Sequence, residues 1–81
     1  MRIIIDNKNK NLIGSRVKEA RVKNNLTQEQ LSVKLETMAI YIDRASISKL
    51  EQQKRIVTDY ELMALSKILK VSISWLLDIE E

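Results

Sequence analysis

The chain has 81 residues and carries 14 Lys and Arg against 11 Asp and Glu, a formal net charge of +3. It has no Cys and no His, which excludes disulfides, thiolate or imidazole metal sites, and nucleophile–histidine catalysis. One Gly and no Pro disfavour a Gly-rich phosphate loop and a turn-rich β-sandwich, and no apolar run approaches the ~20 residues of a membrane span. We therefore expect one small all-α domain, soluble and cytoplasmic, without enzymatic activity, cofactor, metal or membrane contact.

The first two predicted helices follow clear capping signals. Asn11 is a good N-cap for a helix over 12–23, and the segment TQEQ at 27–30 is a capping box that opens a second helix running to about residue 37. Apolar residues recur at helical spacing in both. These inward positions are Ile13, Val17, Ala20, Leu31 and Leu35.

Three more helices are predicted in the second half of the chain. Asp43 caps a helix from 44 to about 52, the capping box TDYE at 58–61 opens a fourth, and Ser72 caps a short fifth. Their inward residues are Ile47, Leu50, Leu62, Leu65, Leu69, Ile73, Leu76 and Leu77. These signals predict a compact fold of five helices.

Two segments do not fit the helical pattern. The run Arg2-Ile3-Ile4-Ile5 is β-branched and is either a short extended arm or a frayed terminus. Residues 38–42 form an apolar connector, longer than a tight turn, that must bury some of its side chains. We divide the chain into an N-terminal arm over 1–11, a domain over 12–78 and an acidic end over 79–81.

Two opposite charges fall at inward positions. Arg21 continues the stripe of the first helix, and Glu51 lies four residues after Ile47 on the third. An unpaired ionised side chain is costly in a protein interior. We therefore predict a structural Arg21–Glu51 pair that fastens the first helix to the third.

The outward face of the third helix has the chemistry of a DNA reader. Because positions i, i+1, i+4 and i+5 share a helical side, it presents Arg44, Ala45, Ser48 and Lys49. Arg and Lys suit guanine O6 and N7, Ser donates or accepts, and an Ala methyl suits the thymine methyl.

Two further places suit DNA phosphates. The start of the second helix offers free N–H groups with the side chains of Thr27 and Gln28, and Lys54 with Arg55 follows the third helix. Each of these features also has an ordinary capping or solvation explanation.

Four ordered segments carry a resemblance: IGSRVK at 13–18, LTQEQL at 26–31, SISKLE at 46–51 and LKVSISWLL at 69–77. Together they resemble the helix-turn-helix domain of the phage lambda repressor and Cro superfamily, the xenobiotic-response-element type. That family implies five helices, of which the third enters the major groove, and usually a dimer on a two-fold operator.

The resemblance also implies roles for single residues. Gln28 falls where the family has a glutamine that contacts a phosphate and braces the recognition helix, and Arg44, Ala45 and Lys49 fall on base-reading positions beside Ser48. Lys54 with Arg55 matches a backbone-contacting basic stretch, and Arg21 with Glu51 matches a structural Arg–Glu bridge. Trp75 is a core residue or, second, a dimer contact.

The chain departs from the family pattern twice. The connector after the second helix is about five residues longer than the family's short, Gly-containing turn. Gln52-Gln53 replaces the glycine that often closes the third helix, which predicts a longer third helix and a displaced Lys54 and Arg55.

The sequence therefore predicts a transcriptional regulator, most plainly a repressor, that is bacterial or phage-encoded and acts as a homodimer on double-stranded operator DNA. One alternative is an autoregulating antitoxin-like DNA-binding protein that also holds a protein partner, with the 38–42 connector as its contact surface. Another is a helical protein-interaction module that does not bind DNA, which the modest net charge and the acidic end would favour.

Overall fold

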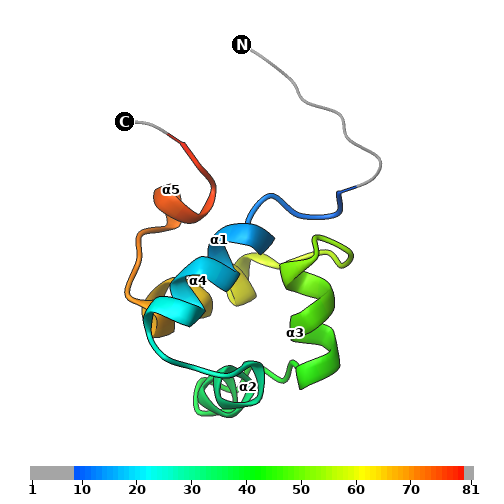
Figure 1. Cartoon of the computed structure of the whole chain (residues 1–81), viewed down its shortest axis with the longest axis vertical. Coiled ribbons are helices and arrows are strands. Elements are labelled where there is room, and N and C mark those ends of the chain that lie inside the picture. The colour runs from blue at the N-terminus through cyan, green and yellow to red at the C-terminus, as the bar shows by residue number, and fades with distance from the viewer. Residues whose placement is uncertain (1–8, 80–81) are drawn as a thin grey trace.

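A computed structural model describes residues 9–79 of the chain. The expected all-α, five-helix architecture is confirmed over these residues (Figure 1). The helices are α1 Gly14–Lys23, α2 Gln28–Glu36, α3 Arg44–Glu51, α4 Asp59–Leu69 and α5 Ile73–Leu76. The β-branched run at 2–5, most of the expected arm and the final two glutamates lie outside the described residues.

Helices α2 to α5 begin where their capping residues predict. Thr27, Asp43, Thr58 and Ser72 are the N-caps of α2 to α5, and each side-chain oxygen accepts a hydrogen bond of 2.7–3.2 Å from the N–H three residues later. The first helix starts at Gly14 and not at 12 as expected. Asn11 still caps it from outside, because its Oδ1 accepts from the backbone N–H groups of Ile13 and Gly14 at 3.1 and 2.8 Å.

The expected extension of the third helix is wrong. Helix α3 ends at Glu51, because Gln53 adopts a left-handed backbone with φ of 62°. The N–H of Lys54 then reaches back to the carbonyl of Lys49 at 2.8 Å, and that of Gln53 to Leu50 at 2.9 Å, which is a Schellman closure without glycine. Lys54 and Arg55 therefore follow α3 directly.

Each of the five helices is followed, one to three residues after its end, by a left-handed residue that is not glycine: Asn25, Ala39, Gln53, Lys70 and Asp78. After each one the next N–H bonds the carbonyl five residues back, as in α3. Since left-handed backbone costs a residue with a Cβ roughly 1–2 kcal/mol, these closures are held by the packing around them.

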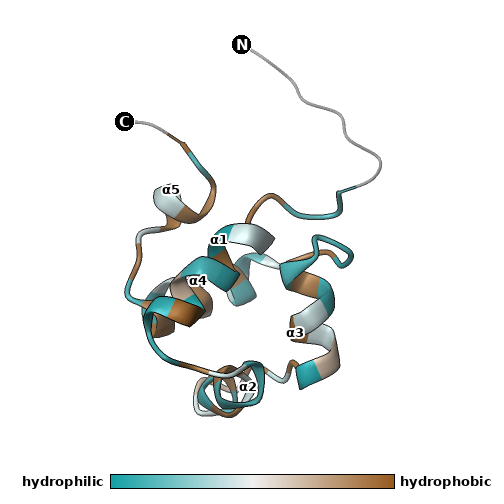
Figure 2. Cartoon of the chain, viewed as in Figure 1, coloured by the Kyte–Doolittle hydropathy of each residue, from teal (hydrophilic) through white to brown (hydrophobic). Residues whose placement is uncertain are grey.

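The core lies between the helices, with α1 packed on α3 and α4, α2 packed on α3 and α4, and α5 beside α4. Figure 2 shows that both hydrophobic and hydrophilic residues occur along α3, as a helix with one buried side requires. The buried apolar residues of the core are Ile13, Val17, Ala20, Leu31, Leu35, Ile42, Ile47, Leu50, Ala64, Leu65, Leu69 and Leu76. None of the helices within 9–79 combines the length and hydrophobicity needed to cross a bilayer.

The 38–42 connector contributes to this core. Ile42 is buried and its carbonyl accepts from Ser32 Oγ at 2.6 Å, while Met38 and Ile40 pack against the core from outside. Tyr41 points away and is 80% exposed. The extra residues therefore fill space beside α2 and lead directly into the cap of α3.

Candidate nucleic-acid interface

The orientation of α3 is fixed by its buried side. Ile47, Leu50 and Glu51 are buried, so the polar side of the helix faces outward. The four candidate base-reading residues lie on that outward side: Arg44, Ala45 and Lys49 are exposed, and Ser48 is half-buried.

The start of α2 lies beside the start of α3. An open hollow is lined by Gln28 of α2 together with Asp43, Arg44, Ala45 and Ser48. A second hollow adjoins it, lined by Arg21, Thr27, Gln28, Glu29 and Arg44. Gln28 and Arg44 border both, so the candidate phosphate residues of α2 and the candidate base-reading residues of α3 form one continuous surface.

Arg21 and Glu51 are in direct contact beneath this surface. Arg21 Nε lies 2.6 Å from Glu51 Oε2 and Nη2 lies 3.1 Å from Oε1, with the two side chains 11% and 3% exposed. Arg21 Nη1 also donates to the carbonyl of Leu26 at 2.8 Å. Both charges are therefore compensated, and the pair joins α1, the α1–α2 loop and α3.

Gln28 completes this network. Its Nε2 donates to Glu51 Oε1 at 3.1 Å, so the first residue of α2 is bonded to the last residue of α3. The hydroxyl of Thr27 accepts from the N–H of Gln30 and closes the capping box. The first N–H groups of a helix have no acceptor within it, and since Thr27 already accepts from Gln30, those of Gln28 and Glu29 are the ones available to an anion at this surface.

The two basic residues after α3 differ in their surroundings. Arg55 is 29% exposed and its guanidinium lies 3.2 and 3.4 Å from the two carboxylate oxygens of Glu61. Lys54 is exposed, and its ammonium pairs with no carboxylate within residues 9–79. Lys54 therefore offers a free charge here, whereas the charge of Arg55 is largely compensated.

Asp43 adds a negative group at the start of α3. The backbone N–H and then the hydroxyl of Ser46 hold the pKa of its carboxyl below the usual 3.8, and the charges of Lys49 and Arg55 lower it further. The carboxylate is thus ionised over the whole neutral range, which matches its role as a helix N-cap.

The sequence did not predict the side-chain contacts of three residues at this surface, Asn11, Arg55 and Gln52. Asn11 Nδ2 donates to the carbonyls of Leu50 and Arg55 at 3.1 and 2.9 Å, which ties the start of the domain to the end of α3. The Arg55–Glu61 pair was not foreseen either. Gln52 Nε2 donates to Ser48 Oγ at 3.0 Å, and its i, i+4 spacing was the available signal.

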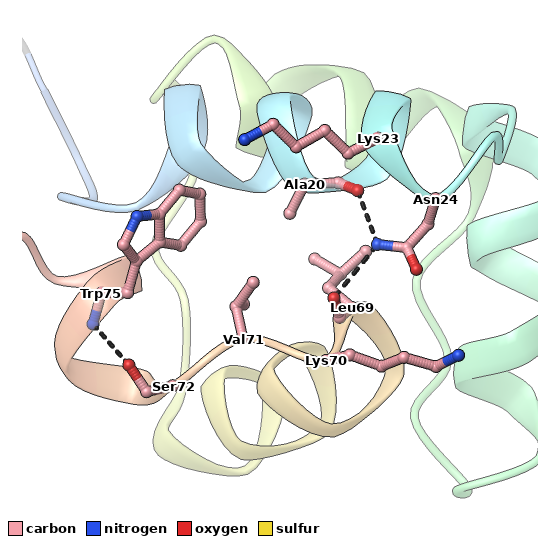
Figure 3. A pocket seen from close by; sticks show the side chains of 8 residues that line it. All are labelled: Ala20, Lys23, Asn24, Leu69, Lys70, Val71, Ser72 and Trp75. Atoms are coloured by element: carbon pink, nitrogen blue, oxygen red, sulfur yellow. Dashed lines mark hydrogen bonds between the residues drawn. The ribbon is translucent and has the colours of Figure 1, made fainter.

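A separate hollow lies between α1 and the α4–α5 loop (Figure 3). Asn24 spans it by donating to the carbonyls of Ala20 and Leu69 at 2.8 and 3.1 Å. Trp75 borders it half-buried, packed on the core, with the guanidinium of Arg16 4.7 Å from its ring centre. None of the residues that line this hollow lies on the outward face of α3.

Comparison with known proteins gives two findings. A model of the helix-turn-helix family matches residues 17–76. The structure is similar to that of the P22 c2 repressor, solved in complex with synthetic operator 9T in the presence of Tl+, with a TM-score of 0.71 and 27% sequence identity. The likeness covers 86% of this chain and 98% of that one. No curated protein matches the sequence.

Proposed function

The chain belongs to the helix-turn-helix family, in its lambda repressor-like group, and from this premise we propose that it is a sequence-specific transcriptional regulator, a repressor, of double-stranded DNA. The observation that carries the proposal is the exposed polar side of α3. The hydrogen bonds that Arg21 and Gln28 donate to the buried Glu51 fix the orientation of this helix against α1 and α2. Binding alone is sufficient for such a role, so the proposal includes no catalysis and no cofactor.

In the proposed complex, α3 lies in the major groove with its N-terminal part toward the bases. Arg44 and Lys49 donate to guanine edges, and the methyl group of Ala45 touches a thymine methyl. Ser48 bonds a base between them.

Phosphate contacts supply most of the affinity. They come from the N–H groups and side chains at Thr27 and Gln28 on one side of the groove, and from Lys54 on the other. Arg55, paired with Glu61, contributes chiefly by holding the loop that carries Lys54.

We further propose a homodimer on a two-fold operator. One recognition helix reads only a few base pairs, and a second copy one helical turn away doubles the site.

In this scheme residues 12–78 are the DNA-binding domain, 1–11 an arm and 79–81 an acidic end. The protein is bacterial or phage-encoded in this scheme and acts in the cytoplasm.

The antitoxin-like alternative needs a partner surface at the 38–42 connector. Ile42 is buried, and Met38 and Ile40 pack on the core, so Tyr41 is the one large side chain of this segment that a partner would meet fully exposed. This leaves the connector a small surface, and the DNA-binding regulator is the better supported function.

A selection from random double-stranded sequences with the purified 81-residue chain tests the proposal. The expected result is enrichment of a two-fold motif whose half-sites are centred about one helical turn apart. Failure to retain DNA even at low salt would instead support the protein-interaction alternative.

A further inference from the structure

Gln52 lies on the same side of α3 as the candidate base-reading residues, although the sequence alone assigns it no contact with a base. It follows Ser48 by four residues and Ala45 by seven, which places all three on one helical side. It is exposed, and it is the C-cap residue of α3. Its side chain therefore borders the proposed DNA contact.

The amide of Gln52 turns back along the helix. Side chains on a helix lean toward its N-terminus, and Gln52 Nε2 accordingly donates to Ser48 Oγ at 3.0 Å. Within residues 9–79 this is the hydroxyl's one hydrogen bond. The bond uses an acceptor site of Ser48 and leaves its O–H proton directed elsewhere.

The pair thus presents two complementary groups side by side: the O–H of Ser48 as a donor and the carbonyl Oε1 of Gln52 as an acceptor. Adenine shows the matching pattern in the major groove, with N7 as acceptor and N6–H₂ as donor. Guanine offers two acceptors, so its O6 would face the Gln52 carbonyl, and thymine offers one acceptor alone.

Resting on the proposed function, we infer that Ser48 and Gln52 act as one unit that selects adenine at a single position of each half-site. Ser48 donates to N7 and Gln52 accepts from N6. Gln52 is a specificity-determining residue as well as the group that sets the hydrogen-bond direction of Ser48.

The test is the random-sequence selection repeated with four variants. Q52L keeps the bulk and removes the amide, and S48A removes the hydroxyl; both are expected to lose the adenine preference, roughly tenfold, at the same base pair. Positions read by Arg44 and Lys49 should stay unchanged. K67L, an exposed change on α4, is the matched control and should leave the whole motif intact.

The fourth variant, Q52E, separates this unit from a merely structural pair. A carboxylate only accepts, so the new side chain would accept a hydrogen bond from the Ser48 O–H and leave only acceptors facing the base. The preference should then shift from adenine to cytosine, whose N4 amino group is a donor. An unchanged motif with Q52L and Q52E would overturn the inference while the proposed function stands. No motif with the unaltered chain would overturn both, and thermal melting of each variant checks that it folds.

Discussion

Gly14, the first residue of α1, lies so close to the carbonyl oxygen of Leu50 that a Cβ on Gly14 would overlap it. The same Cβ would lie 2.9 Å from the carbonyl oxygen of Glu51. Both neighbours are backbone atoms, so neither can turn aside without moving α3. The chain's single glycine therefore sets how closely α1 approaches the end of the proposed recognition helix.

Replacement of Gly14 by Ala is expected to destabilise the fold by roughly 1–3 kcal/mol, because the methyl group overpacks this contact. Thermal or urea unfolding measures the effect. Ser15→Ala is the control, since Ser15 is the next residue of the same helix and is exposed. Equal stability of the two variants would show that α1 and α3 are not in close contact.

Replacement of Glu51 by Ala is expected to cost roughly 3 kcal/mol of unfolding free energy. The change leaves the guanidinium of Arg21 without its carboxylate at a site where that side chain is only 11% exposed, and it frees Gln28 as well. Glu36→Ala removes an exposed carboxylate at the end of α2 and is the comparison. Equal melting temperatures for the two would contradict a stabilising Arg21–Glu51 pair.

Replacement of alanine by glycine should have opposite effects on stability at a left-handed residue and inside a helix. Ala39 is exposed with φ of 59°, so Ala39→Gly should stabilise the protein by about 0.5–1 kcal/mol. Ala45 is exposed inside α3, so Ala45→Gly should destabilise it by a similar amount. Denaturant unfolding of both gives the signs, and a loss of stability with Ala39→Gly would argue against the left-handed backbone there.

The cap of α3 predicts a pH dependence. The pKa of Asp43 is lower in the folded chain than the 3.8 of a free side chain. Its ionised form therefore contributes stability above pH 3.8, and that contribution is lost as the pH falls through the lowered value. Asp43→Asn keeps a capping oxygen and does not titrate, so the melting-temperature difference between the two proteins should change below pH 3.8 and stay constant above it.

Replacement of Lys54 should weaken DNA binding, whereas replacement of Arg55 should lower the stability of the fold. With roughly 6 to 8 phosphates contacted by a dimer, log K against log salt should slope about −5 to −7, and Lys54→Ala should make that slope shallower by about 2 for two copies. Arg55→Ala breaks the pair with Glu61 and should lower the melting temperature instead. An unchanged salt slope for Lys54→Ala would remove Lys54 from the phosphate contacts.

The sequence predicts the starts of α2 to α5 from their capping residues, but it does not predict the left-handed residues that close the helices. A cap such as Thr27 or Thr58 acts on an N–H three residues away, so the local sequence contains both partners. The left-handed residues, Ala39 and Gln53 among them, have no such preference, and tertiary packing imposes their backbone. This is why the third helix was expected to run on.

The contacts of the candidate site also divide into those that the sequence predicts and those that only the fold brings about. Arg21 and Glu51 were paired because each interrupts an apolar stripe, a signal that periodicity carries. The bonds from Asn11 to the carbonyls of Leu50 and Arg55 span 39 and 44 residues and leave no mark in the pattern. Nor does the compensation of Arg55 by Glu61, which depends on how the α3–α4 loop folds back.

The central claim is that the outward side of α3 reads bases, and Lys49 tests it most directly. Lys49 is exposed on that side and forms no ion pair within residues 9–79. In a random-sequence selection, Lys49→Ala should relax the preference at one base pair of each half-site, at a cost of ~1–3 kcal/mol, while Lys54→Ala weakens binding to all sequences alike. A Lys49→Ala protein that folds and selects the same motif as the unaltered chain would contradict the claim.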